Sequence, residues 1–113
     1  MKLIPKLRDG AFEFMRTRGA PNVPKNAAAM IMEDEDMTLV MPTDEVDEYS
    51  FAWISLVQET SLHATGITKA FSAALSDAGI PCNVLAGFKH DHILVPYALK
   101  EMAMEIIAKV EVK

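Results

Sequence analysis

The stretch from residue 86 to 96, AGFKHDHILVP, places two histidines on either side of an aspartate. On an extended strand His90 and His92 would point to the same side, as metal ligands two residues apart can. A metal site needs a third protein ligand, and His63 is the only other histidine. No HExxH or CxxC pattern is present. We therefore interpret residues 89–91 as a polar hairpin turn and expect no metal and no cofactor, with a small metalloprotein using His63, His90 and His92 as a weaker alternative.

The sulfur-containing side chains give little support for catalysis. Cys82 is the single cysteine and cannot form an internal disulfide, which fits a reducing compartment. It follows a helix stop, where the role of a small buried hydrophobic residue is favoured over that of a nucleophile. The methionines follow the spacing of strands and helices, which favours core packing over copper binding: Met15, Met30, Met32, Met37, Met41, Met102 and Met104. These side chains therefore favour structural roles over a nucleophile or a copper site.

A polar loop, ETSLHATG, ends at Gly66 and precedes a helical pattern. A glycine at such a junction lets the backbone approach a ligand, and the helix dipole there favours an anion such as the α-carboxylate of an amino acid. The alternative is a glycine needed only for the turn. His63 lies in the same loop and is either a ligand contact or an ordinary surface histidine. Trp53 is either a core residue or an aromatic wall of a ligand site, and its position in an apolar strand favours the core.

The composition is that of a globular protein, with 113 residues of which 50% are hydrophobic and 24% are charged. This length predicts one domain with one core. The net charge is −5 and the basic residues are scattered, so we expect no nucleic acid partner. No apolar stretch approaches the roughly 20 residues of a membrane span, and the start of the chain is too short and too charged for a signal peptide. We expect no membrane partner and a cytoplasmic location.

The first half of the chain contains two predicted strands. Residues 11–16 alternate apolar and polar side chains, and residues 37–42 form an apolar run that Pro42 ends. Residues 17–26 are rich in glycine and proline and predict a loop. The alanine-rich residues 27–34 indicate a short helix.

The second half is more regular and begins with a strand over residues 51–58. A helix follows the loop, because apolar side chains recur at helical spacing: Ile67, Ala70, Phe71, Ala74, Leu75 and Ala78. Thr65 is its expected N-cap and Gly79 its expected C′ residue.

Two apolar runs at residues 82–88 and 92–95 have the spacing of a hairpin. After Pro96 a second helical stripe is formed by Leu99, Met102, Ala103, Ile106 and Val110. Residues 110–112 are a candidate final strand.

This order predicts an α+β fold of the ferredoxin-like type, with a βαββαβ core over residues 49–113. Both helices have one apolar face and can cover the same side of a sheet. Residues 1–48 would pack on this core as a degenerate N-terminal βαβ half that extends the sheet.

The segments TLVMP, FAWISL and TSLHATGITKAFSAALSDAGIPCNVLAGFKHDHILVP together resemble small bacterial proteins built from ACT domains, which are related to the cytosolic arginine sensors of animals. The resemblance covers residues 37–109. It implies a non-enzymatic regulatory module that binds a small molecule between two ACT units of a homodimer. We expect this small molecule to be an amino acid. Residues 1–48 are short for a complete unit and resemble the degenerate first half of this family.

The resemblance also implies where the ligand lies, near the first strand–helix loop and the neighbouring strand. Carried over to this sequence, the site comprises Ser61, Leu62, His63, Ala64, Thr65, Gly66, Ile67, Asn83, Val84, Leu85, Ala86 and Asp91. Asp91 matches an acidic position before the last core strand and would face a cationic ligand group. Because the N-terminal half is shortened, a structural or protein-interaction module that binds no ligand is the alternative.

Overall fold

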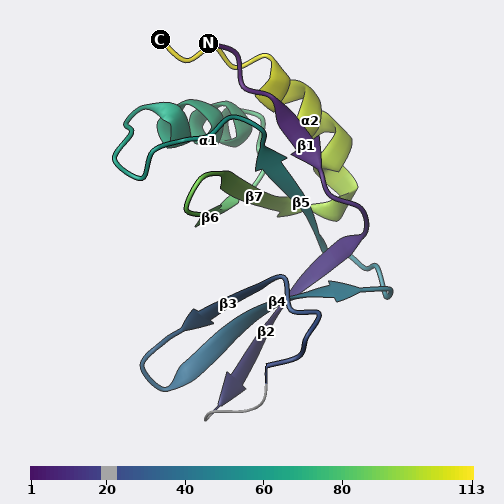
Figure 1. Cartoon of the computed structure of the whole chain (residues 1–113). Coiled ribbons are helices and arrows are strands. Elements are labelled where there is room, and N and C mark those ends of the chain that lie inside the picture. The colour runs from purple at the N-terminus through teal and green to yellow at the C-terminus, as the bar shows by residue number, and fades with distance from the viewer. Residues whose placement is uncertain (19–22) are drawn as a thin grey trace.

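The computed structural model describes residues 1–18 and 23–113, which form an antiparallel seven-stranded sheet and two α-helices (Figure 1). The elements in chain order are β1 (Pro5–Leu7), β2 (Ala11–Arg18), β3 (Ala29–Met32), β4 (Asp36–Thr43), β5 (Phe51–Leu56), α1 (Ile67–Asp77), β6 (Asn83–Ala86), β7 (Asp91–Pro96), the 3-10 turn Tyr97–Leu99 and α2 (Lys100–Ala108). The order from β5 onward, strand, helix, strand, strand, helix, is the one that the sequence predicts.

The main core lies between the helices and one face of the strands β1, β5 and β7 (Figure 1). Successive side chains of a strand point to opposite faces, so Ala52, Ile54 and Leu56 of β5 all pack toward the helices. Phe71 of α1 and Ile107 of α2 are fully buried against them. The two helices therefore cover one side of the sheet, and the alternate residues of β5 face the other side.

The place beside β5, where a ferredoxin-like fold has its last strand, is taken by β1 from the start of the chain. Leu7 pairs with Ile54 and Pro5 with Leu56. The expected strand at residues 110–112 is reduced to an isolated bridge between Lys2 and Glu111, because β1 already occupies the edge of β5.

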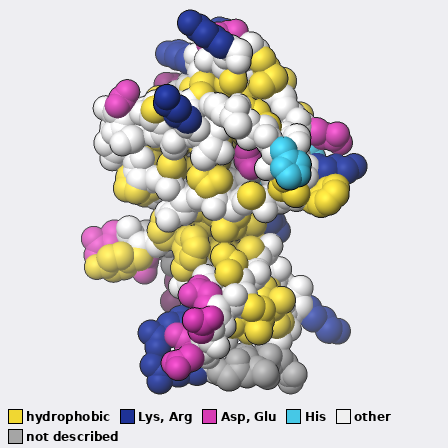
Figure 2. Space-filling model, turned by 90° about the vertical axis from the view of Figure 1, so that its left-hand side faces the viewer, with side chains coloured by type: hydrophobic (Ala, Val, Ile, Leu, Met, Phe, Trp, Pro, Cys, Tyr) yellow, Lys and Arg dark blue, Asp and Glu magenta, His cyan; other side chains and the backbone are white. Residues whose placement is uncertain are grey.

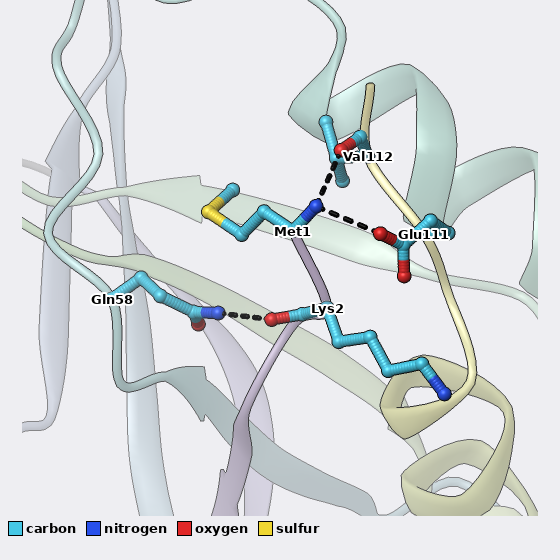
Figure 3. Close-up of polar contacts among 5 residues, drawn as sticks. All are labelled: Met1, Lys2, Gln58, Glu111 and Val112. Atoms are coloured by element: carbon cyan, nitrogen blue, oxygen red, sulfur yellow. Dashed lines mark hydrogen bonds and ion pairs between the residues drawn. The ribbon is translucent and has the colours of Figure 1, made fainter.

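The two ends of the chain are held together at this edge (Figure 3). The amino group of Met1 donates to Glu111 Oε1 at 2.9 Å and to the carbonyl of Val112 at 2.8 Å. Gln58 Nε2 donates to the Lys2 carbonyl at 2.6 Å. The first residues thus contact the helix-covered body.

The expected helix at residues 27–34 is wrong, because this segment contains strand β3. Residues Ala29–Met32 pair in antiparallel register with β4, with Met30 opposite Leu39. β4 lies between β3 and β2, so its backbone groups are satisfied on both sides. The gain from this pairing outweighs the high helix propensity of the alanines, because tertiary context overrides local propensity. The described elements of the N-terminal half are consequently all strands. The acidic residues 33–36 turn between β3 and β4, where the Glu33 N–H donates to the Asp36 carbonyl.

The predicted loop at 17–26 begins later than expected, since β2 continues to Arg18. Residues 19–22 lie outside the described part of the chain. The methionine prediction is confirmed only in part: Met37 and Met41 are buried, whereas Met32 and Met102 are at least half exposed.

A second cluster joins β2, β3 and β4 to the uncovered face of β5 and β7. Phe12 and Val40 pack there against Trp53 and Leu94, and the ring centroids of Phe12 and Trp53 are 5.5 Å apart. Trp53 is buried, which confirms its expected place in the core. This three-stranded part covers only a portion of that face, as β2 meets β5 at the single pair Phe12 and Phe51.

Candidate functional site

A small cavity of about 120 Å³ lies between the loop after β5 and the first residue of β7. This cavity is lined by six of the residues that the sequence predicts for the ligand site: Ser61, Leu62, Ala64, Ile67, Ala86 and Asp91. Two threonines that the sequence reasoning missed complete the wall, Thr60 and Thr68. Thr60 is buried, and its N–H donates to the Lys89 carbonyl at 2.7 Å, which ties the loop to the turn between β6 and β7.

The other expected site residues do not line this cavity: His63, Thr65, Gly66, Asn83, Val84 and Leu85. His63 and Thr65 are exposed in the loop. Leu85 packs on the opposite face of the sheet, against the cluster that contains Trp53. The alternation of side chains along β6 explains why neighbouring residues of this strand cannot share one wall.

Asp91 is the first residue of β7 and not part of the turn, which is a correction to the predicted turn at 89–91. The turn comprises residues 87–90 and is closed by the hydrogen bond from the Gly87 N–H to the His90 carbonyl at 2.9 Å. Asp91 therefore points, with Ile93, toward the helix side of the sheet, and His92 points to the other side. The three residues of the His-Asp-His stretch consequently serve two different faces.

The start of α1 lies beside the same cavity. Gly66 is the N-cap residue with φ 89°, and no side chain caps the helix, so Thr65 is not the N-cap. A Cβ at Gly66 would meet nothing within 4 Å, so glycine is required for the positive φ and not for close approach. At the other end Gly79 has φ 75° and donates to the Ser76 carbonyl, which confirms it as the C′ residue.

On the opposite face, Trp53, Ser55 and His92 form a chain of hydrogen bonds. Trp53 Nε1 donates to Ser55 Oγ at 3.0 Å, and Ser55 Oγ lies 2.7 Å from His92 Nδ1. Partial burial lowers the pKa of His92 below its ordinary 6.5, and the proximity of His90 adds to this effect. His92 is therefore held as a neutral imidazole at neutral pH.

We expect the replacement His92→Gln to flatten the dependence of stability on pH. Because the folded chain holds the His92 proton less tightly, the unfolded chain binds more protons as the pH falls below 6.5, and the free energy of unfolding decreases there. Urea denaturation between about pH 5 and 7 measures the slope. The exposed loop variant His63→Gln is the matched control, and an unchanged slope in His92→Gln would contradict the expectation.

The histidines do not assemble a metal centre in residues 1–18 and 23–113, where no group of three or more His, Cys, Asp or Glu side chains could hold an ion. His90 Nδ1 instead lies 3.1 Å from the Leu56 carbonyl. Cys82 packs against the main core, and burial raises the pKa of its thiol, which disfavours the nucleophilic thiolate. None of the described helices has the length and apolar character needed to cross a membrane.

Comparison with known proteins agrees with this architecture. Residues 48–109, more than half of the chain, match the family model of the ACT domain. No curated protein matches. Among solved structures, a Vibrio cholerae protein of unknown function, described as a possible transport protein, is 30% identical with a TM-score of 0.83, over 96% of this chain and 88% of that chain.

Two further structures are more distant in sequence. A protein from Agrobacterium tumefaciens has 19% identity and a TM-score of 0.76, over 96% of this chain and 88% of its own. The structure of the alpha and beta subunits of aspartokinase has 12% identity and a TM-score of 0.66, over 93% of this chain and 95% of its own. These two show the fold alone. The family match confirms the resemblance read from the sequence: the chain belongs to the ACT domain family, whose members are regulatory modules that bind small molecules such as amino acids.

Proposed function

We propose that this chain is a non-enzymatic regulatory module that binds an amino acid in the cavity beside Asp91 and acts as a homodimer. The observation that supports this most is the convergence of the loop after β5, the start of α1 and the first residue of β7 on one cavity. The loop and the start of α1 follow one another in the sequence, whereas Asp91 comes more than twenty residues later and joins them only in the folded chain.

The cavity offers complementary groups for an amino acid. The Asp91 carboxylate is an acceptor for a cationic ammonium group, and the hydroxyls of Thr60, Ser61 and Thr68 can accept or donate. The uncapped N-terminus of α1 favours the carboxylate at the other end of the ligand. Asp91 takes part in no salt bridge within the described ranges, so its charge is available to a ligand.

A second copy of the chain would complete the site. The cavity of about 120 Å³ is smaller than the 300–1,000 Å³ of typical small-molecule pockets. It adjoins β6, which ends the order of strands and has no partner on its outer side among the described strands. The face on which β6 lies shows hydrophobic side chains across its middle (Figure 2). Pairing there would enlarge the wall, and a ligand that binds one dimer arrangement better would shift the population toward it.

Replacing Asp91 by asparagine tests this proposal. A thermal-shift screen of the twenty amino acids identifies the ligand that stabilises the wild-type chain most. We expect Asp91→Asn to weaken its binding about ten- to hundredfold in calorimetry, because a hydrogen bond to a charged group contributes about 1.5–3 kcal/mol.

The matched control is Asp77→Asn, which removes the same charge from the exposed end of α1. Equal affinity of Asp91→Asn and Asp77→Asn would contradict the assignment of the site. A chain that binds none of the twenty amino acids would instead favour the alternative, a module for protein interaction without a ligand. The presence of the cavity supports the ligand-binding module over that alternative.

A further inference from the structure

A second and larger cavity lies on the opposite side of the sheet from the Asp91 cavity. Its volume is about 600 Å³, within the range of small-molecule pockets. It extends from β1 across the end of β5 to β7, and its lining includes Lys6, Arg8, Asp9, Ser55, Val57 and His92. The proposed amino-acid site shares none of these residues.

The pairing of the strands places a polar row on this face. Lys6 of β1 lies opposite Ser55 of β5, and Ser55 lies opposite His92 of β7. Residues paired across neighbouring strands point to the same face, so the three side chains stand side by side. Leu7 and Leu56, which alternate with them, pack into the core on the helix side.

Arg8 is positioned next to this row by two aromatic rings. Its guanidinium carbon lies 5.1 Å from the centroid of the Phe12 ring and 5.1 Å from that of the Trp53 ring. The backbone N–H of Arg8 also donates to the backbone carbonyl of Trp53 at 2.9 Å. Cation–π contacts hold the guanidinium without occupying its hydrogen-bond donors, which remain available for an anion.

The charge around the cavity is positive although the chain as a whole carries −5. Neither Lys6 nor Arg8 forms a salt bridge in the part of the chain that the structure describes, and Asp9 is the one carboxylate of the lining. Two cations without ion-pair partners beside a hydroxyl and an imidazole make a receptor for an anion. The half-exposed side chain of Val57 adds apolar surface at the same place.

We propose that this cavity, which we name the Arg8 cavity, binds a small organic carboxylate, with the carboxylate at Arg8 and Lys6 and the apolar body against Val57. It is a second ligand site that goes beyond the proposed amino-acid site. Adjacent residues of β7, Asp91 and His92, face the two sites from opposite sides of one strand.

Butyrate is the probe for the test, because it has one carboxylate and a short apolar body. Trp53 is the only tryptophan of the chain and contacts the Arg8 guanidinium, so its fluorescence reports on the Arg8 cavity. We expect butyrate to change this fluorescence in a saturable way and Arg8→Gln to weaken binding at least tenfold in calorimetry. Arg18→Gln, which removes an exposed arginine of β2, should bind butyrate like the wild type.

Further probes and variants separate the outcomes. Lys6→Gln should also weaken butyrate binding, and it covers the case in which Arg8→Gln fails to fold. Asp91→Asn should leave butyrate binding unchanged, so that failure of the amino-acid site and failure of the Arg8 cavity are distinguishable. Absence of saturable binding at millimolar butyrate, equal binding of butylamine, or equal binding of inorganic phosphate would each overturn the proposal.

Discussion

Replacing Leu3 by alanine is expected to lower the free energy of unfolding by about 2–5 kcal/mol, the range for removing a large aliphatic side chain from a core. Leu3 is only 2% exposed and belongs to the cluster between the helices and the sheet. A residue this near the start of a chain would ordinarily be dispensable. The large effect is expected because Leu3 lies just before β1, which pairs with β5 of the central sheet. Urea denaturation of the wild type and the variant measures the difference.

The neighbouring residue provides the control for this prediction. Ile4 is 54% exposed, so Ile4→Ala should change the free energy of unfolding by no more than about 0.5 kcal/mol. Equal effects of the two substitutions would mean that the first residues are a peripheral addition to the fold.

Phe12→Ala is expected to cost about 3–5 kcal/mol, as substitutions of buried phenylalanines by alanine do. Phe12 is fully buried and packs on Trp53, where β2 meets the uncovered face of β5. The loss should be accompanied by a change in Trp53 fluorescence, because the tilted aromatic contact is removed. Denaturation followed by fluorescence and by circular dichroism measures both effects.

Phe14 gives a matched comparison on the same strand. It is 39% exposed and contacts Phe51 at a centroid distance of 5.1 Å. Phe14→Ala should therefore destabilise the chain clearly less than Phe12→Ala. If only the β2–β4 part unfolded in Phe12→Ala, with the rest of the chain as stable as before, the two parts would not form one cooperative unit.

Much of the helix-covered part could be predicted from the sequence, because its signals are local. The apolar stripe of α1 and the stop at Gly79 follow from spacing alone, and Phe71 and Leu75 are buried as that stripe predicts. The stripe of α2 was predicted less well: Met102 is 50% exposed and Ile107 is buried in its place. A helix of nine residues carries too few turns to fix its buried face from hydrophobicity alone.

The N-terminal half could not be predicted in the same way, because its structure depends on partners distant in the sequence. Residues Ala29–Met32 form a strand only through pairing with β4. β1 occupies the edge of β5 although nearly fifty residues separate the two along the chain. No local pattern distinguishes this arrangement from a terminal strand at residues 110–112.

The candidate sites show the same division. The family resemblance implies a site at the loop before α1 and Asp91, and part of that loop lines one cavity together with Asp91. Thr60 was missed because its burial depends on a hydrogen bond to the turn at Lys89. The row of Lys6, Ser55 and His92 follows from strand register, which the sequence leaves open. The His-Asp-His stretch therefore does not form one site; it lies where β7 separates two cavities.

The central claim is that an amino acid binds at Asp91 in a homodimer, and a chemical-shift titration of the ¹⁵N-labelled chain with each of the twenty amino acids tests it most directly. At a concentration where sedimentation shows a dimer, we predict that one amino acid shifts the amide signals of residues 60–68, Ala86 and Asp91 in a saturable way. The signals around Arg8 on the opposite face should change little. A dimer in which no amino acid shifts the signals around Asp91, or a chain that stays monomeric while it binds, would contradict the account.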